Sequence, residues 1–463
     1  MQRRAYRHDE LVRVLAPQSI AVVGASPTPG TLGFRTIHNL ARFGGAIYLV
    51  NGRHREILGR PCYPDLDSLP EVPDCVVLAI PRESTEQSVR DCARIGAGGV
   101  VLFASGYAEM GTADRIAAQQ SLEAIARESG LRIIGPNCTG FANHAIALTA
   151  GFAEFAESTV RSAAVGLITQ SGALGLALSQ AAVHGVSFSH VLTCGNSCDV
   201  DVADLVGYLA EDPFCSAIAC QFEGLSDPAR MVDAARRAKA AGKPLIVCKI
   251  GKGETGRSAV AFHTATEPGD AVLYRESLLN AGAVLVDRFD ALVETAAFFS
   301  KFPRSNRESN PDGLAILSST GGGAIMVADE ADEAGVPMPQ PGESTLAILH
   351  GHIPDFGAAR NPCDATAQAT RYPDSLLQCA KALLADPAYG MLLIPLSRVH
   401  NVQLFLDIGQ LGHAAGRPVC IVWLSQWLEG PGIADLEAHP GLSVFRSAHS
   451  CLAAVAAWRA MTP

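Results

Sequence analysis

Short apolar segments recur along the first third of the chain and alternate with longer segments that have helical spacing. The fully apolar runs include SIAVVGAS, AIYLVN, CVVLAI and GGVVLFASG, whereas residues 85–95 and 113–129 repeat apolar positions every three or four residues. Strands that are apolar on both faces and alternate with helices indicate a parallel sheet covered on both sides. The pattern therefore predicts a doubly wound α/β domain over residues 1–145.

Two further strand–helix series follow along the chain. One begins at AAVGLITQSGALG and ends near Phe299, and the next begins at GLAILSSTGGGAIMVADEA and continues to the C-terminus. The segment between them, residues 301–313, is polar and rich in turn-forming residues, as is typical of a linker. We expect a second α/β domain at residues 146–300 and a third at residues 314–463.

The second and third series share internal spacings. The interval from Gly172 to Gly185 equals that from Gly322 to Gly335, and LAEDPF and AGKPLIV in one series match LLADPA and AGRPVCIV in the other. Self-similarity at fixed intervals is the signature of duplicated structural units. The sequence therefore predicts two homologous domains, the third with an extra insertion.

Each copy contains a turn of hydroxyl residues and glycine between its first strand and the following helix. The turn residues are Ser171 and Gly172 in one copy and Thr320, Gly321 and Gly322 in the other. Free backbone amides and the helix dipole make such turns anion sites, although tight strand-to-helix packing also explains a single glycine turn. Their duplication favours one phosphate held between two helix starts.

The first domain has basic residues where a dinucleotide site needs a carboxylate. Gly24 and Gly30 follow its first strand without forming a GxGxxG motif, and the next strand is followed by Arg53 and Arg55. An NAD site places an acidic residue there to bind the ribose hydroxyls. Basic groups suit a phosphorylated ribose, as in coenzyme A or NADP, and simple exposure to solvent also explains each arginine.

Composition and charge narrow the classes of partner. The 463 residues are 48% hydrophobic, and 36 Lys and Arg against 46 Asp and Glu give a net charge of −10, which disfavours nucleic acid and anionic membranes. No apolar run spans a bilayer, and the first residues lack a signal-peptide core. The 13 scattered cysteines lack metal-site spacing. We predict a cytoplasmic protein with no metal site, no membrane partner and no nucleic-acid partner.

A single histidine, His263, stands in the segment GRSAVAFHTATEPGD among glycine, small residues and hydroxyls. The segment has little apolar periodicity, so it predicts a flexible loop rather than a packed helix. Imidazole is partly unprotonated at neutral pH and can act as a nucleophile or phosphoryl carrier. A solvent-facing loop histidine is the alternative.

Many short motifs occur in the order found in one enzyme family. From about Ser19 onward they include VVGAS, SGYAEMG, GPNCTGFAN, TQSGALG, CGNSCDVD, FEGL, GRSAVAFHT, STGGG and NPCD. In this order the chain resembles the NDP-forming acyl-CoA synthetases, which include succinyl-CoA synthetase and ADP-forming acetate–CoA ligase. The resemblance implies a Rossmann-like CoA-binding domain followed by two flavodoxin-like, succinyl-CoA synthetase-like domains.

The resemblance also implies roles for particular residues. His263 would be phosphorylated in catalysis, Glu223 would orient its ring, and the two glycine turns would cradle the phosphohistidine. Only the second domain carries this carboxylate, because Ser397 occupies the equivalent position in the third. The positions implied in CoA binding are Gly24, Ser26, Thr28, Gly30, Arg53, Ser105, Gly106 and Asn137.

Family membership would make the chain a subunit that interconverts acyl-CoA, ADP and phosphate with carboxylate, CoA and ATP. The family holds its nucleotide and Mg²⁺ on an ATP-grasp domain, for which the three domains leave no span. We therefore expect a separate ATP-grasp partner that binds ADP or ATP and Mg²⁺. Phe262 and Ala265 replace the family's serine and glycine beside the histidine. They leave open a non-catalytic CoA-binding or acyl-CoA-binding regulator. An NADP-dependent oxidoreductase would leave the second and third domains unexplained.

Overall fold

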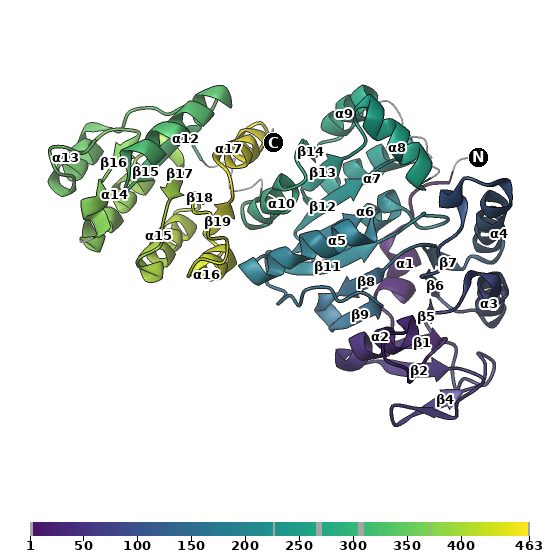
Figure 1. Cartoon of the computed structure of the whole chain (residues 1–463). Coiled ribbons are helices and arrows are strands. Elements are labelled where there is room, and N and C mark those ends of the chain that lie inside the picture. The colour runs from purple at the N-terminus through teal and green to yellow at the C-terminus, as the bar shows by residue number, and fades with distance from the viewer. Residues whose placement is uncertain (1–2, 226, 265–270, 304–309, 371, 462–463) are drawn as a thin grey trace. The chain divides into compact units, whose positions relative to one another are not determined.

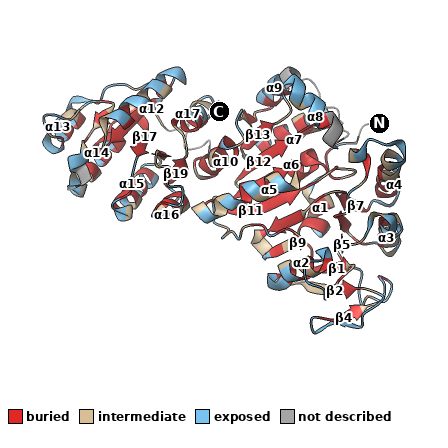
Figure 2. Ribbon diagram, in the orientation of Figure 1, coloured by how far each residue is buried: buried red, intermediate tan, exposed pale blue. Residues whose placement is uncertain are grey.

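The computed structural model describes residues 3–225, 227–264, 271–303, 310–370 and 372–461. The chain divides into two compact units, one formed by Met1–Ala182 with Phe188–Leu292 and the other by Val183–Ser187 with Val293–Pro463. Across the described residues the strands form three mostly parallel sheets whose interiors are buried, and the flanking helices expose one face to solvent (Figures 1 and 2). The prediction of an α/β fold is confirmed.

The first sheet has the strand order β3-β4-β2-β1-β5-β6-β7 within residues 19–134, all of which the structure describes. Only β3 and β4 pair antiparallel, and this pair extends the edge beyond β2. The strands are β1 (Ser19–Val23), β2 (Ala46–Val50), β3 (Glu56–Ile57), β4 (Arg60–Tyr63), β5 (Cys75–Leu78), β6 (Gly99–Leu102) and β7 (Arg132–Ile134).

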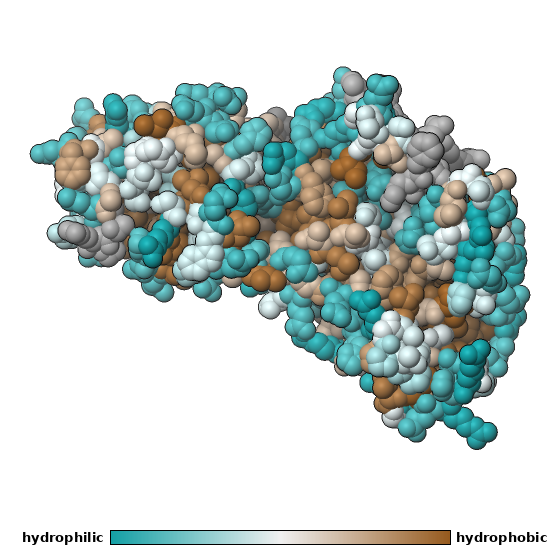
Figure 3. All heavy atoms as spheres, in the orientation of Figure 1, coloured by the Kyte–Doolittle hydropathy of each residue, from teal (hydrophilic) through white to brown (hydrophobic). Residues whose placement is uncertain are grey.

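Helices cover the first sheet, and the two helices expected at residues 85–95 and 113–129 are confirmed as α3 and α4. Both turn mostly hydrophilic side chains to solvent on the face shown in Figure 3. The helices are α1 (His8–Leu15), α2 (Leu32–Asn39), η1 (Leu40–Arg42), α3 (Arg82–Ile95), η2 (Ala108–Met110) and α4 (Ala113–Ser129).

The second sheet has the order β14-β13-β12-β10-β11-β8-β9 in the described part of the chain, with β8 and β9 attached antiparallel at the β11 edge. Its strands are β8 (Gly140–Asn143), β9 (Leu148–Gly151), β10 (Val165–Thr169), β11 (Phe188–Thr193), β12 (Ala217–Phe222), β13 (Leu245–Lys249) and β14 (Val284–Leu285). Its helices are η3 (His144–Ile146), α5 (Gly172–Ser179), η4 (Gln180–His184), α6 (Val202–Glu211), α7 (Pro228–Ala240), α8 (Glu254–Thr264) and α9 (Ala271–Asn280).

The third sheet belongs to the second compact unit and has the order β16-β15-β17-β18-β19 among the described residues. Its strands are β15 (Gly313–Ser318), β16 (Cys363–Asp364), β17 (Tyr389–Leu396), β18 (Val419–Trp423) and β19 (Leu442–Phe445). The helices of this part are α10 (Ala291–Lys301), α12 (Gly321–Glu333), α13 (Glu343–His352), η5 (Ala367–Thr370), α14 (Pro373–Ala385), α15 (Val402–Ala414), α16 (Ile433–Ala438) and α17 (Ala448–Arg459).

The second and third sheets share one topology, as the sequence repeat predicts. In both, the five main strands lie in the order 2-1-3-4-5 counted along the chain. The repeated motifs also make the same contacts. Lys243 donates to the carbonyl of Asp212, and Arg417 donates to that of Asp386, so each cation satisfies the carbonyl of an Asp-Pro turn that follows a helix. The repeat is therefore a conserved local structure as well as a sequence pattern.

The predicted domain boundaries remain predictions, and the structure shows which elements lie near them. Residues 140–151, around the first boundary, form the β8–β9 hairpin of the second sheet. Helix α10 ends within the second compact unit, where Phe298 packs against Phe445 and Trp458. Part of the expected linker, residues 304–309, lies outside the described residues.

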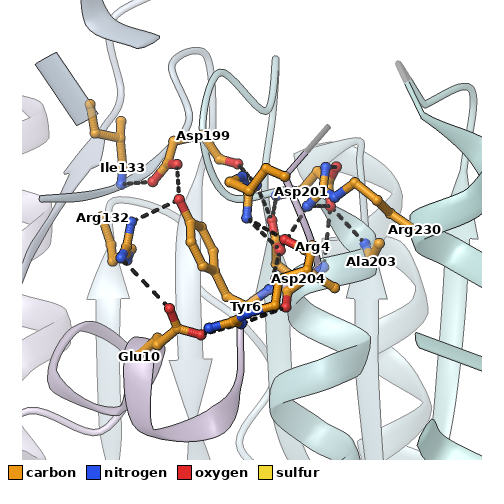
Figure 4. A network of polar contacts seen from close by, with 12 residues as sticks. Arg4, Tyr6, Glu10, Arg132, Ile133, Asp199, Asp201, Ala203, Asp204 and Arg230 are labelled. Atoms are coloured by element: carbon orange, nitrogen blue, oxygen red, sulfur yellow. Dashed lines mark hydrogen bonds and ion pairs between the residues drawn. The ribbon is translucent and has the colours of Figure 1, made fainter. Parts of the chain in front are cut away.

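A buried network of charged and polar groups joins the N-terminal segment to the first two sheets (Figure 4). The Tyr6 hydroxyl donates to Asp199, which also accepts from the backbone N–H of Ile133 in β7. The fully buried carboxylate of Asp204, on α6, accepts hydrogen bonds from Arg3 and Arg230 and from the Tyr6 N–H. Burial alone would raise the pKa of Asp204, but the Arg3 hydrogen bond and the Arg230 charge hold it below its ordinary value.

A buried histidine makes the stability of the fold depend on pH. His190, on β11, is fully buried, and within the described residues neither ring nitrogen has a hydrogen-bond partner. Burial lowers the pKa of His190 from 6.5 to about 4, against the opposing charge of Asp212. The unfolded chain binds this proton more tightly than the folded chain does. The contribution of neutral His190 to the free energy of unfolding is therefore fully present above about pH 6.5 and is lost as the pH falls toward 4.

We therefore expect unfolding in urea to show about 2 kcal/mol less stability at pH 5 than at pH 7.5 from His190 alone. The His190→Leu variant, which removes the proton-binding group, should show a correspondingly smaller loss between the same two pH values. Equal losses in the two proteins would contradict this assignment.

No helix in the described residues is both long enough and apolar enough to cross a membrane. All 13 cysteines lie in the described ranges and are free thiols. All of them are buried except Cys198, which is half-buried. Burial raises the pKa of the most deeply buried thiols, for example that of Cys75. A raised pKa keeps these thiols protonated and unreactive. They serve as small apolar side chains in the cores.

Candidate functional site

The predicted CoA-binding residues gather at one edge of the first sheet. Each follows the carboxyl end of a parallel strand: Gly24 to Gly30 follow β1, Arg53 follows β2, Ser105 and Gly106 follow β6, and Asn137 follows β7. In sheets of this topology, ligands bind outside the carboxyl ends of the strands, where the strand order reverses. The strand order reverses at β1, between β2 and β5, so the glycine turn after β1 stands at that position.

The turn after β1 has a conformation that requires glycine. Gly24 has φ +83°, and a Cβ there would stand 2.4 Å from the carbonyl oxygen of Ala79. Gly33, in the first turn of α2, approaches so closely that its Cβ would lie 2.1 Å from the Gly24 carbonyl oxygen. Helix α2 is thereby drawn against the turn, and its N-terminus is capped by the Thr31 side chain. The backbone amides of this helix start and turn are suited to bind phosphate.

The turn at Ser105 and Gly106 is shaped by residues that the sequence interpretation did not single out. The carboxylate of Glu109 accepts a hydrogen bond from the Gly106 N–H at 2.6 Å and another from the side-chain amide of Asn196 at 2.6 Å. Asn196 in turn accepts from the Asn137 side chain at 3.2 Å. The motifs SGYAEMG, GPNC and CGNSCDVD therefore meet in space. Their joint presence in the sequence is the signal that could have identified Glu109 and Asn196.

The predicted Glu223 and Ser171 lie at the corresponding edge of the second sheet. Ser171 caps α5 after β10, and Glu223 follows the last residue of the adjacent strand β12. The strand order reverses at β10, between β12 and β11. Glu223 is buried, with 6% of its surface exposed. The structure therefore brings this carboxylate and the turn at Ser171 and Gly172 to the point where the strand order of the second sheet reverses (its switch point), within one compact unit.

The expectation of a loop around His263 is partly wrong. The backbone from Glu254 to Thr264 is helical, which places His263 in the last turn of α8, and Ala265 to Asp270 lie outside the described residues. Buried Val260 packs against Gly251, where a Cβ would stand 2.6 Å from a methyl carbon of Val260. The segment has little apolar periodicity, so the sequence pattern did not reveal the helix.

Helix α8 packs against η2 of the first domain. Since η2 contains Glu109, the helix that carries His263 lies beside the turn at Ser105 and Gly106. The helix that carries the predicted nucleophile and part of the predicted CoA site thus pack together in one compact unit.

The second glycine turn lies in the other compact unit. Thr320 precedes α12, which begins at Gly321 and Gly322, and the Ser318 hydroxyl donates to the Thr320 carbonyl as Thr169 does to Ser171 in the second sheet. The two turns differ in their caps, because the Ser171 hydroxyl accepts from the Leu174 N–H whereas the Thr320 side chain makes no such bond within the described residues. They also differ in nearby charge. The Asp364 carboxylate lies 3.0 Å from the place of a Cβ on Gly321, so it adds negative charge beside this helix start.

Two family models match the parts of the chain that carry these sites. Residues 18–144 match a CoA binding domain, and residues 162–299 match the succinyl-CoA ligase like flavodoxin domain. The alpha subunit of ADP-forming acetate–CoA ligase II from Pyrococcus furiosus is 33% identical over 403 residues, which cover 86% of this chain and 84% of that subunit. The chain belongs to the family of NDP-forming acyl-CoA synthetases.

Other members of the synthetase family extend the comparison. A trans-feruloyl-CoA synthase from an unknown prokaryotic organism is 34% identical over 399 residues, covering 84% of this chain and 55% of its own length. The structure of dinucleotide forming acetyl-coenzyme A synthetase 1 from Ca. Korarchaeum cryptofilum, in complex with phosphate and ADP, matches 97% of this chain and 96% of its own at 27% identity and a TM-score of 0.84. These matches extend over the second and third domains as well as the first. An NADP-dependent oxidoreductase would leave the second and third domains unexplained.

Proposed function

We propose that this synthetase chain interconverts acyl-CoA, ADP and phosphate with carboxylate, CoA and ATP, together with a nucleotide-binding partner. The observation that carries the proposal is the packing of α8, which holds His263, against η2 beside the first domain's carboxyl edge. A phosphoryl carrier must receive its phosphate where the acyl thioester is cleaved, and this neighbourhood meets that need. Buried Glu223, at the switch point of the second sheet, adds the carboxylate that an orienting role requires.

Three transfers compose the reaction. Phosphate attacks the thioester carbonyl, forming acyl phosphate as the C–S bond breaks and CoA leaves. A ring nitrogen of His263 then attacks the acyl phosphate at phosphorus and releases the carboxylate. ADP takes the phosphoryl group from phospho-His263 to form ATP. We propose that Glu223 accepts the other ring N–H, which keeps the attacking nitrogen unprotonated. The helix start at Ser171 and Gly172 would stabilise the phosphoryl charge, and the sequence repeat predicts the same ability to bind an anion for the helix start at Thr320, Gly321 and Gly322.

The nucleotide site is proposed to lie on a separate ATP-grasp subunit that binds ADP or ATP and Mg²⁺. A relative named as an alpha subunit matches this chain over most of both lengths, whereas the trans-feruloyl-CoA synthase extends well beyond the matched part. The name of the first relative supports a division of the activity between two chains. Acetate and ferulate enzymes are about equally similar to this one, so the family leaves its acid open.

The CoA site supports a prediction about Arg53, which is exposed and follows β2. We propose that its guanidinium binds the 3′-phosphate of CoA. Calorimetric titration should show CoA binding to the Arg53→Ala variant weakened about tenfold, while dephospho-CoA binds both proteins with similar affinity. Arg90→Ala, which removes an exposed arginine on α3, is the matched control. Equal weakening for both ligands would overturn the assignment to the 3′-phosphate.

The regulatory alternative is favoured by Phe262 and Ala265, which replace smaller family residues beside the histidine. Incubation with the ATP-grasp subunit, Mg²⁺ and γ-labelled ATP separates the two functions. Label on the wild-type chain and none on the His263→Asn variant supports the synthetase. Tight CoA binding without labelling of the wild-type chain supports the regulator.

A further inference from the structure

The dipeptide Glu223–Gly224 has all four of its backbone polar groups bonded to two side chains. The Gln170 side-chain oxygen accepts from the N–H of Glu223 at 2.7 Å and from that of Gly224 at 3.3 Å. The Gln170 side-chain nitrogen donates to the Gly224 carbonyl at 3.0 Å. The Lys249 ammonium donates to the Glu223 carbonyl, also at 3.0 Å. The turn that carries the Glu223 carboxylate is therefore held from both sides.

These two side chains come from the strands on either side of β12. Gln170 follows β10, Lys249 ends β13, and the sheet order places β12 between those strands. Both side chains are buried, with 4% and 8% of their residue surfaces exposed. Burying an amide or an ammonium is unfavourable unless it is hydrogen-bonded, so both groups stabilise the one turn conformation that satisfies them.

The environment of Lys249 is apolar as well as polar. Its ammonium lies 5.5 Å from the centre of the Tyr274 ring and 6.0 Å from that of Phe222. Burial lowers the pKa of Lys249, the charges of Lys252 and Arg257 act in the same direction, and Glu223 opposes them. An ammonium in such surroundings depends on its carbonyl acceptors, which fixes the position of the turn relative to β13.

We propose that Gln170 and Lys249 are positioning residues that hold the Glu223 carboxylate toward the phosphorylated histidine. The proposal rests on the function proposed above, in which Glu223 orients His263. Gln170 also precedes Ser171, the cap of α5, so it couples the position of the carboxylate to that of the phosphate-binding helix start. Neither residue contacts the reacting atoms in this account, because both act through the turn.

The test measures the rate of His263 phosphorylation by γ-labelled ATP in the complex with the ATP-grasp subunit. The variants Gln170→Asn, whose amide is too short to reach the turn, and Lys249→Met are each expected to be slowed about 10- to 100-fold. Lys239→Met, which removes an exposed lysine of α7, is the matched control and should react at the wild-type rate. Unfolding midpoints for each variant identify any that fail to fold.

A double-mutant cycle separates positioning from a general structural role. If Gln170 and Lys249 act through the carboxylate, their substitutions should cause little further slowing in the Glu223→Gln background. Multiplicative slowing in that background, or wild-type rates in both folded single variants, would overturn the inference. Absence of label on the wild-type chain would instead refute the proposed function, so the two failures are distinguishable. If one variant does not fold, the cycle with the other decides the outcome.

Discussion

The His263→Asn variant, assembled with a wild-type partner, is expected to form ATP from acyl-CoA, ADP and phosphate about 10³-fold more slowly or worse. Asparagine occupies a similar volume but lacks a nucleophilic nitrogen, so the covalent route through a phosphorylated side chain is closed. Coupled measurement of ATP formation under saturating substrates would show the loss in kcat.

CoA binding provides the control for this variant. Because His263 is not among the predicted CoA-binding residues, the His263→Asn protein should bind CoA with wild-type affinity in calorimetry. A variant that binds CoA normally and retains more than a tenth of wild-type turnover would show that the phosphoryl group passes elsewhere. Replacement of His413, on α15 of the third sheet, provides a matched histidine substitution that should leave turnover unchanged.

The largest expected effect on stability is at Asp204. The Asp204→Ala variant should lose about 3–5 kcal/mol of unfolding free energy, because removal of one partner leaves buried charge uncompensated. Arg230 has only 10% of its side chain exposed, and among the described residues it would keep Asp201 as its one carboxylate partner. Equilibrium unfolding in urea at pH 7.5 measures the change.

The control for Asp204 is Asp9→Ala, at an exposed position in the first turn of α1, which should alter stability by about 0.5 kcal/mol or less. The network also ties the N-terminal segment to α6 through the Tyr6 N–H and Arg3. Protease digestion should therefore cut the N-terminal segment faster in Asp204→Ala than in wild type. Equal stability of the Asp204→Ala and wild-type proteins would contradict a structural role for the network.

Much of the fold was predictable because most of its strands are apolar and buried on both faces. Apolar runs such as those ending at Val23 and Val50 have no solvent-facing alternation, which points to parallel sheets. The repeat was predictable because identical turns impose identical spacing. Gly242 and Gly416 both adopt positive φ after corresponding helices, and the cations that follow them make equivalent contacts.

Other features depend on contacts between distant parts of the chain and left no local pattern. The β8–β9 hairpin joins the second sheet through pairing with β11, about fifty residues later. Glu109 and Asn196 are hydrogen-bonded across 87 positions, and each looks like an ordinary polar residue in its own motif. Gln170 lies in the motif TQSGALG, but its contact with the turn at Glu223 depends on two strands that are distant in the sequence.

Mapping of acid-labile phosphate after reaction with labelled ATP, Mg²⁺ and the ATP-grasp subunit identifies the residue that carries the phosphoryl group. We expect phosphate on the imidazole of His263, discharged by ADP to ATP and by carboxylate with CoA to acyl-CoA. Phosphate on another residue that is discharged at the catalytic rate, or sustained turnover with His263 unmodified throughout, would contradict it.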